Sequence, residues 1–156
     1  MTTDINWNHL PGEDNISRIV LPNGIVLLVK SDFTSPSIVL SGYLYTGTQQ
    51  DPPDKLGLAL FTSYGLMRGT VNRRFRRIYH DLESAGASFG FGASVQTTSF
   101  GGKALVEDLP LLLNTLSDCI RWPVFPPRQM GRLKAQLLIG LQLREQDTGD
   151  MASLKF

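Results

Sequence analysis

The chain has few of the residues from which metal centres and disulfide-stabilised folds are built. Among its 156 residues there is one cysteine, Cys119, and there are two histidines, His9 and His80. A single cysteine excludes an internal disulfide and any zinc cluster made of several cysteines, and two histidines alone argue against a separate metal site. The cysteine count fits a reducing compartment, and we predict a cytoplasmic protein.

The chain also lacks a strong excess of either charge and lacks long apolar runs. It has 15 Lys and Arg against 14 Asp and Glu, which gives a net charge of +1. Such a balance creates no overall field that would attract nucleic acid or an acidic membrane surface, so we predict neither as a partner. No apolar run approaches the ~20 residues of a membrane span. The polar residues 1–15 lack the features of a secretory signal.

What the chain does have is the composition of a domain with a real core, with 42% hydrophobic and 19% charged residues. Residues 1–16 carry a turn signal at Pro11-Gly12 but no apolar period, and we expect a tail or covering arm. Residues 17–156 form the predicted domain. The chain ends at Phe156 inside a helical pattern that has no stop signal, so we expect a C-terminally incomplete fragment of a longer gene product.

Strand signals occur in two parts of the chain. An Asn-Gly pair between the apolar runs of residues 18–21 and 25–30 predicts a hairpin. Residues 38–46 alternate in a way that predicts a strand covered on both faces. Residues 88–94 and 97–106 predict two further strands, both bent by glycines.

Two helices are expected between these strand regions. Residues 56–68 carry apolar side chains nearly all around a helical wheel, which predicts a deeply buried helix. For the next helix, Thr70 or Asn72 can cap the start, and Gly86 supplies a left-handed stop. Its apolar side chains have helical spacing: Phe75, Ile78, Tyr79 and Leu82.

Two leucine-rich helices complete the pattern. The first begins at Asp108 and closes at Trp122, and the second follows Pro127 and stops near Gly149. The expected buried stripe of the first is Leu109, Leu112, Leu113, Leu116 and Ile120. That of the second is Met130, Leu133, Leu137, Leu138 and Leu141. This order of strands and helix pairs predicts an α+β fold, an antiparallel sheet with helices packed on one face.

Short motifs occur along the chain in a family-like order. They are Leu21-Pro22-Asn23-Gly24, Gly47-Thr48 with Pro52-Pro53, Gly57-Leu58-Ala59 with Gly69-Thr70, Leu82-Glu83-Ser84-Ala85-Gly86-Ala87, Glu107-Asp108-Leu109-Pro110, and Pro123-Val124-Phe125. Over residues 18–156 this set resembles the N-terminal domain of the M16 metallopeptidases, the group of pitrilysin, insulin-degrading enzyme and mitochondrial processing peptidase. The resemblance implies the LuxS/MPP-like metallohydrolase fold.

Active members of that family carry H-x-x-E-H on the first helix, where two histidines hold zinc and the glutamate activates a water molecule. The matching positions here are Leu60, Ser63 and Tyr64. None of the three can take the role of the family residue, so the resemblance implies no catalytic residue on this helix.

The family's third zinc ligand is a glutamate on the long helix, and the resemblance places it near Gly140 or Leu141. Neither residue can bind zinc, and Glu145 lies one turn too far along. The two histidines of the chain also lie outside the motif. We therefore predict no metal and no zinc cofactor.

The resemblance implies a zinc-less, non-catalytic subunit that pairs with a zinc-bearing homologue and completes a chamber around an unfolded peptide. In the family, an edge strand can bind peptide by adding it to the sheet. Three alternatives stay open: a homo-oligomer, a purely structural interaction protein like the core subunits that respiratory complexes derived from this family, and an active zinc peptidase with atypical ligands.

Five residues are candidates for peptide binding. Arg73, Arg74, Arg76 and Arg77 form the one dense charge cluster, at a helix start where the macrodipole disfavours cations. The cluster is either a solvated face or subunit contact, or a guide for an acidic peptide or other anion. Tyr64 either fills the space of the lost metal site or hydrogen-bonds a peptide backbone.

Three other features have simple structural interpretations. Cys119 lies beside an apolar position and is expected to be a small buried side chain. His80 is expected on the exposed side of its helix. The glycine-rich segments match neither a Walker loop nor a dinucleotide loop, so we interpret them as bends in curved strands.

Overall fold

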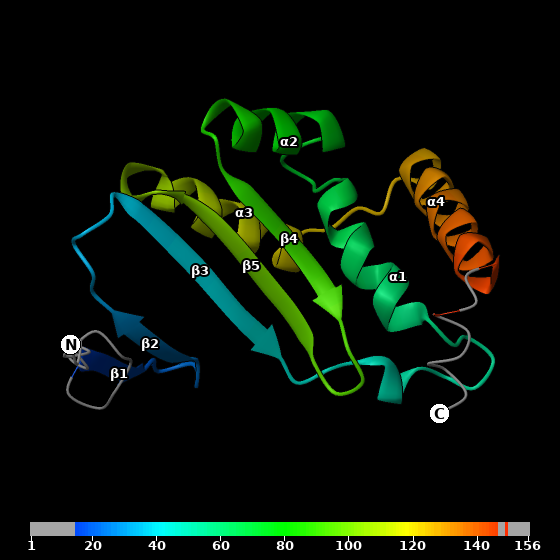
Figure 1. Cartoon of the computed structure of the whole chain (residues 1–156), viewed down its shortest axis with the longest axis horizontal. Helices are drawn as coiled ribbons and strands as arrows, with labels where there is room; N and C mark the ends of the chain where they lie inside the picture. Colours follow the sequence, from blue (N-terminus) through cyan, green and yellow to red (C-terminus); the bar gives the residue numbers. More distant parts are fainter. Residues whose placement is uncertain (1–14, 147–148, 150–156) are drawn as a thin grey trace, which may run out of the picture. The chain divides into compact units, whose positions relative to one another are not determined.

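A computed structural model of the chain describes residues 15–146 and residue 149. The chain divides into two compact units, Met1–Pro36 and Ser37–Phe156 (Figure 1). The predicted tail, residues 1–16, lies almost entirely outside the described residues, and so does the expected helical pattern after Gly149. Within the described part, no helix is both long and apolar enough to cross a membrane.

The first unit contains the predicted hairpin. Strand β1 (Ile16–Val20) pairs antiparallel with β2 (Val26–Lys30). The turn between them contains Gly24 with a left-handed φ of 84°, and the Gly24 amide donates to the Leu21 carbonyl at 2.9 Å. The Asn-Gly signal therefore predicted this turn correctly, because glycine adopts positive φ without a steric cost.

The second unit is built on a three-stranded antiparallel sheet. Its strands are β3 (Ser37–Leu44), β4 (Ser88–Ala93) and β5 (Thr98–Leu105). The spatial order is β3-β5-β4, so β5 is central and β4 is an edge of the sheet within the described residues (Figure 1). All three strands confirm the sequence prediction.

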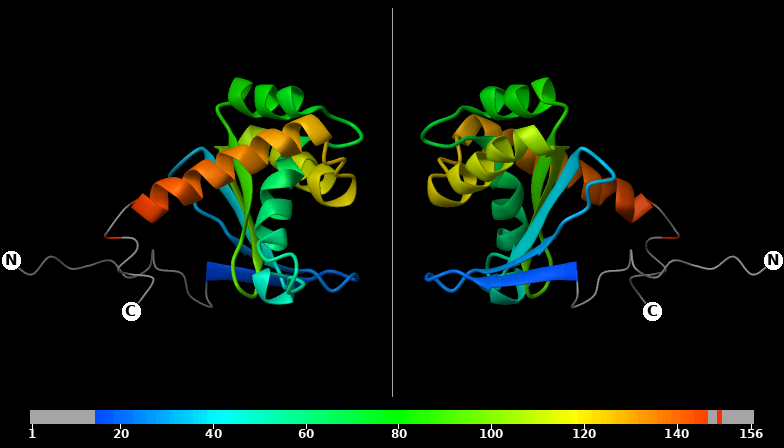
Figure 2. Two further views of the ribbon diagram at one scale, coloured as in Figure 1. Left: turned by 90° about the vertical axis from the view of Figure 1, so that its right-hand side faces the viewer. Right: turned by 90° about the vertical axis from the view of Figure 1, so that its left-hand side faces the viewer.

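Helices and short 3₁₀ turns account for the rest of this unit. They are η3 (Thr48–Gln50), α1 (Leu58–Gly65), η4 (Leu66–Arg68), α2 (Phe75–Ser84), η5 (Val106–Asp108), α3 (Leu109–Arg121) and α4 (Pro127–Gln146). Helices α1 and α3 lie on the same side of the sheet when it is seen edge-on (Figure 2). The predicted α+β class, with helices packed on one face of an antiparallel sheet, is confirmed.

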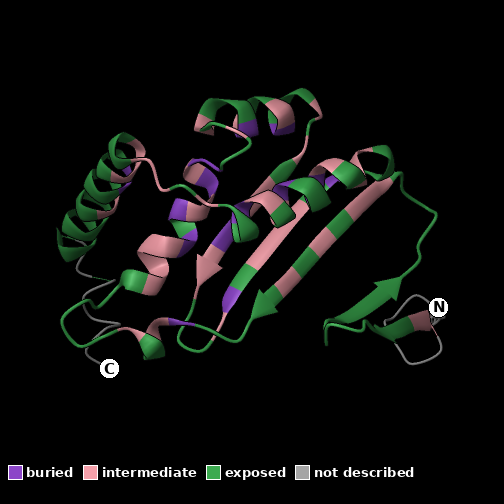
Figure 3. Cartoon of the chain, turned by 180° about the vertical axis from the view of Figure 1, so that it is seen from behind, coloured by how far each residue is buried: buried purple, intermediate pink, exposed green. Residues whose placement is uncertain are grey.

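The prediction that both faces of residues 38–46 would be covered is wrong. Ile38 and Leu40 pack against the core, whereas Val39 on the opposite face is 69% exposed and Tyr43 is 59% exposed. Figure 3 views the sheet from the side that α3 crosses, and partly buried and exposed positions alternate along β3. The helices of this unit cover one face only, and the alternating apolar residues did not reveal this.

One hydrophobic core holds the second unit together. It joins η4, α2, β4, β5 and α3 through a cluster of buried side chains: Met67, Ile78, Leu82, Phe91, Ala104, Leu112 and Cys119. Cys119 is fully buried, as predicted.

The buried face of α3 differs from the predicted stripe. Leu112, Thr115 and Cys119 are buried, whereas Leu113 and Ile120 are exposed. Two fully buried positions of α3, Thr115 and Cys119, were not part of the predicted leucine stripe. In α4 the stripe is likewise shorter than predicted, since Leu133 is buried but the later leucines, Leu138 and Leu141, are exposed.

Helix α1 is not deeply buried, contrary to the prediction. It packs against β4 and α4, and its buried residues are Ser63 and Gly65. A side chain at Gly65 would place its Cβ 2.9 Å from Met130 and 3.0 Å from the Phe125 ring, so this glycine permits the close packing. Leu58 and Tyr64, on other faces of the helix, are exposed.

The ends of α2 were partly predicted. Gly86 has the expected left-handed φ of 59°, and the following amide donates to the Leu82 carbonyl at 2.8 Å. The start has no side-chain cap, contrary to the prediction. The Thr70 hydroxyl instead accepts from the Arg73 amide at 2.9 Å in the preceding turn, and the Asn72 side chain donates to Asp118 on α3.

Candidate functional site

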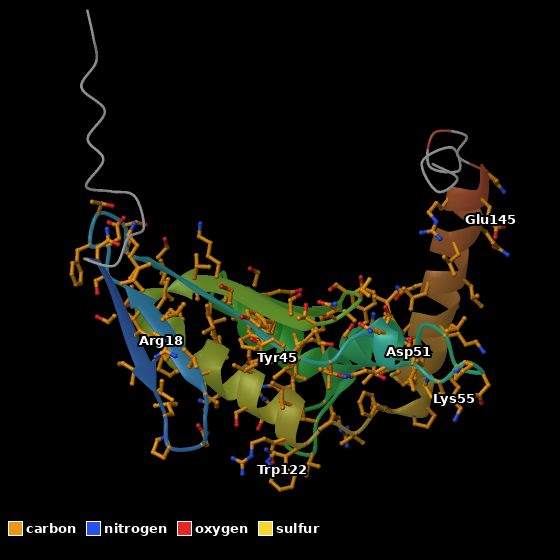
Figure 4. The ribbon with its side chains drawn as sticks, turned by 90° about the horizontal axis from the view of Figure 1, so that it is seen from below. Arg18, Tyr45, Asp51, Lys55, Trp122 and Glu145 are labelled. Carbon is orange, nitrogen blue, oxygen red and sulfur yellow. The ribbon has the colours of Figure 1, made fainter. Side chains whose placement is uncertain are left out.

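Helix α1 has a fixed starting point. Asp51, labelled in Figure 4, accepts from the Gly57 amide at 2.8 Å and from the Ala59 amide at 2.9 Å. Gly57 itself has a left-handed φ of 90°, which side chains with a Cβ rarely adopt. The carboxylate therefore accepts hydrogen bonds from two of the free amides at the helix start, and its negative charge interacts favourably with the positive end of the helix dipole.

The far end of the helix meets the start of α4. The Val124 amide donates to the Gly69 carbonyl at 3.1 Å, and Thr70 forms a bridge with Pro123. A Cβ at Gly69 would lie 3.2 Å from the Pro126 ring. The Gly69-Thr70 motif thus contacts the Pro123-Val124-Phe125 motif, which is distant in sequence, and this contact positions α4 beside α1.

A pocket of about 290 Å³ lies among α1, η4, β4, α2 and α4. Two of the three motif positions, Ser63 and Tyr64, line it, and Gln136 and Leu137 line it from α4. Gly140 and Leu141, the expected region of the third ligand, lie one turn further along α4 and are exposed. The structure thus brings two of the degenerate motif positions together with Gln136 and Leu137 of α4.

The side chains at this site do not fit a zinc ion. Leu60 has no donor atom, and the Ser63 hydroxyl is buried and donates to the Leu60 carbonyl at 2.8 Å. Tyr64 offers only a phenol. Zinc sites in proteins use histidine, cysteine and carboxylate ligands, and the described residues contain no group of three such side chains close enough to hold a metal.

The arginine cluster separates into residues with different roles. The Arg73 guanidinium is held inside the fold: its Nε lies 2.9 Å from an Asp118 oxygen, and its terminal nitrogens donate to α3. Arg77 forms an ion pair with Asp81 at 2.8 Å. Arg74 and Arg76 are exposed and form no ion pair among the described residues.

Among the polar residues of the pocket, sequence reasoning missed three as site residues: Arg68, Tyr79 and Gln136. A signal for one of them was present, since Arg68 follows Tyr64 by four residues and so shares its side of the helix. The other two come from α2 and α4, and no local spacing could have linked them to α1.

The outer edge of β4 runs beside α1. The Ser94 amide donates to the Thr97 carbonyl at 2.7 Å at the end of the β4–β5 hairpin. Hydrogen-bonded and non-hydrogen-bonded pairs alternate in an antiparallel ladder. Phe89, Phe91 and Ala93 therefore direct their backbone N–H and C=O groups away from β5, toward the outer edge of the described sheet.

The remaining titratable candidates lie away from the pocket. Burial raises the pKa of the Cys119 thiol to about 11, and its sulfur contacts the Met67 sulfur at 3.6 Å. His80 is exposed on α2, as predicted, with a ring nitrogen 3.7 Å from Asp81.

Comparison with known proteins gives a consistent result. The chain is 21% identical over 144 residues to the probable mitochondrial-processing peptidase subunit beta of Arabidopsis thaliana, an alignment that covers 92% of this chain and 27% of the plant protein. It is also 21% identical over 136 residues to an uncharacterized zinc protease of Bacillus subtilis, covering 87% of this chain and 33% of that protein.

A solved structure matches the fold closely. The crystal structure of a peptidase M16 inactive domain from Pseudomonas fluorescens superposes with a TM-score of 0.80 and 26% identity, covering 90% of this chain and 34% of that one. This chain thus spans about a third or less of the length of these relatives. The model of the family described as insulinase, peptidase family M16, matches residues 26–148. The resemblance inferred from the sequence motifs is therefore confirmed, and the chain belongs to peptidase family M16.

Proposed function

We propose that this chain is part of a non-catalytic M16 subunit that pairs with a zinc-bearing homologue and helps form the peptide-binding chamber of the complex. The observation that carries the proposal is the helix α1, which keeps its position beside β4 and α4 while Leu60, Ser63 and Tyr64 supply no zinc ligand. A relative that is named as a subunit and a structural neighbour that is named as an inactive domain support it. We place residues 17–156 as the first domain of that subunit and expect a cytoplasmic location.

Peptide binding would use the open edge of β4. An extended peptide could pair with the outward N–H and C=O groups of Phe89, Phe91 and Ala93, as in other cases of strand addition. Tyr64 lies in the pocket between this edge strand and α4 and could hydrogen-bond the same peptide. Exposed Arg74 and Arg76 are the members of the arginine cluster that could still guide an acidic segment toward it.

A proline at Ala93 tests this role. Ala93→Pro removes one outward N–H but no ladder hydrogen bond, and the preceding Gly92 tolerates the added ring. The matched control, Ala93→Val, keeps the N–H and suits a strand. We expect the proline variant to bind an unfolded fluorescent peptide at least about threefold more weakly than the control, the effect of one lost hydrogen bond. Equal binding by the two variants would remove β4 from the proposal.

The alternatives predict different results. A purely structural interaction protein would form its complex but bind no peptide at all. An active peptidase with atypical ligands would contain stoichiometric zinc by elemental analysis and would cleave peptide without a partner. Either result would replace the proposed function.

A further inference from the structure

Arg68 is the one cation among the described residues that line the pocket beside Tyr64. It closes η4, directly after α1. A terminal nitrogen of its guanidinium donates to Gln136 Oε1 at 3.3 Å, and its Cζ lies 5.2 Å from the centre of the Phe75 ring. Contacts from α4 and α2 therefore hold the guanidinium in one place, and little conformational entropy would be lost when a ligand binds it.

The same guanidinium has an unmet hydrogen-bond donor. Arg68 Nε is buried and has no hydrogen-bond partner, the only such side-chain atom among the described residues. None of the three ion pairs in that part of the chain includes Arg68. Burying this one donor atom without a partner is costly, while the rest of the Arg68 side chain is only partly buried and keeps its charge without a carboxylate partner among the described residues. A ligand in the adjoining pocket cannot reach this covered atom, but it can reach the terminal nitrogen Nη1, which forms no hydrogen bond among the described residues.

The rest of the pocket suits an anion that carries an apolar stem. The described residues of its lining include no carboxylate, so none of them neutralises the Arg68 charge. Tyr64 and Tyr79 bring phenol groups. Burial raises the pKa of Tyr79, and the positive charge of Arg68 opposes this rise only in part, so the hydroxyl remains a donor at neutral pH. Phe91 and Leu133 supply apolar surface.

We propose that this pocket binds a carboxylate of the bound peptide, with the Arg68 guanidinium as its counter-ion. The inference rests on the proposed function, because it names the kind of peptide residue that the β4 edge would deliver to the pocket. The guanidinium fork matches a carboxylate in a bidentate geometry. A volume of about 290 Å³ holds one amino-acid side chain, and the apolar lining suits a stem of methylene groups better than a free inorganic anion.

The carboxylate can come from an aspartate or glutamate side chain or from the C-terminus of the peptide. Three fluorescent peptides of one sequence distinguish the sources: one with an internal glutamate and an amidated end, one with glutamine and an amidated end, and one with glutamine and a free end. Their dissociation constants for the full-length protein are measured by fluorescence anisotropy. We expect one of the two carboxylate peptides to bind about ten- to a hundredfold more tightly than the neutral peptide, as for a hydrogen-bonded charge pair.

Variants assign this preference to Arg68. In Arg68→Gln the preference disappears, while the affinity for the neutral peptide is retained. Arg128→Gln is the matched control, because it removes the same charge from an exposed arginine of α4 outside the pocket, and it keeps the preference. The peptide comparison on the unmodified protein needs no variant, so it stands even if Arg68→Gln does not fold.

The outcomes separate this inference from the proposed function. If no peptide binds, the proposed function fails and the carboxylate site fails with it. If all three peptides bind equally, peptide binding stands and the carboxylate site alone is refuted. A preference that persists in folded Arg68→Gln also refutes it.

Discussion

The mostly buried ion pair that joins the turn before α2 to α3 gives a quantitative test of how this fold is stabilised. Arg73 and Asp118 lie 45 residues apart in sequence, and the Arg73 Nε is 2.9 Å from an Asp118 oxygen. Their side chains are only 16% and 20% exposed. The other Asp118 oxygen accepts from Asn72 at 2.9 Å, and Arg73 also donates to the buried Thr115 hydroxyl at 3.3 Å. Removing either charge leaves partners without hydrogen bonds.

The magnitude follows from this burial. Exposed ion pairs contribute about 0.2–1 kcal/mol, whereas breaking a fully buried pair costs about 3–5 kcal/mol. The pair is mostly but not fully buried, so we expect Arg73→Ala and Asp118→Ala each to lower the free energy of unfolding by about 2–3 kcal/mol, and their coupling energy to be about 1–2 kcal/mol. The neighbouring Arg77–Asp81 pair has the same charges, but Arg77 is 69% exposed. Its coupling should not exceed about 0.5 kcal/mol.

The assay is a double-mutant cycle on each pair, followed by urea unfolding with circular dichroism at low and moderate salt. A coupling for Arg73–Asp118 no larger than that for Arg77–Asp81 would refute the reasoning. So would an Arg73→Ala variant of unchanged stability that binds peptide more weakly, because Arg73 would then be a ligand contact and not a structural residue.

Two further predictions concern packing and titration. Gly47→Ala should lower the free energy of unfolding by about 2–3 kcal/mol, because the new Cβ would lie 2.5 Å from the carbonyl oxygens of Ser94 and Val95. Gly131→Ala in α4, where the new Cβ meets open space, should raise the free energy of unfolding by about 0.5–1 kcal/mol. Similar urea midpoints for the two variants would contradict this prediction. Burial raises the pKa of the Cys119 thiol from its ordinary value of 9.0 to about 11 in the fold, so between these two pH values the native state keeps its proton while the unfolded chain loses it. The free energy of unfolding should therefore fall by about 2–3 kcal/mol as the pH rises from about 9 to 11. Iodoacetamide should label Cys119 at pH 8 only when urea unfolds the protein. Rapid labelling of the native protein would contradict this, because it would show that the thiol is accessible.

Local signals in the sequence predicted the elements well. The Asn-Gly turn and Gly86 both require positive φ, and a short-range pattern is sufficient to identify such positions. The start of α4 at Pro127 was predictable because proline fixes φ and cannot continue the preceding turn. These features depend on the residue itself and its immediate neighbours.

Features set by distant partners were not predictable. The apolar wheel of residues 56–68 indicated burial, yet Tyr64 is 39% exposed, because which faces of α1 are covered depends on where β4 and α4 lie. The sequence indicated that Arg73 belongs to a surface cluster of arginines. Its partner Asp118 lies on another helix, so no local pattern could reveal the ion pair. The pocket residues Arg68 and Gln136 meet only in the folded chain.

The most direct test of the account is a titration of the full-length protein into a fixed concentration of a zinc-bearing M16 homologue from the same organism, with hydrolysis of an internally quenched peptide as the readout. We predict that the rate rises and saturates at one chain per catalytic chain, and that the added protein alone shows no hydrolysis. An unchanged rate, or chelator-sensitive cleavage by this protein on its own, would contradict the account.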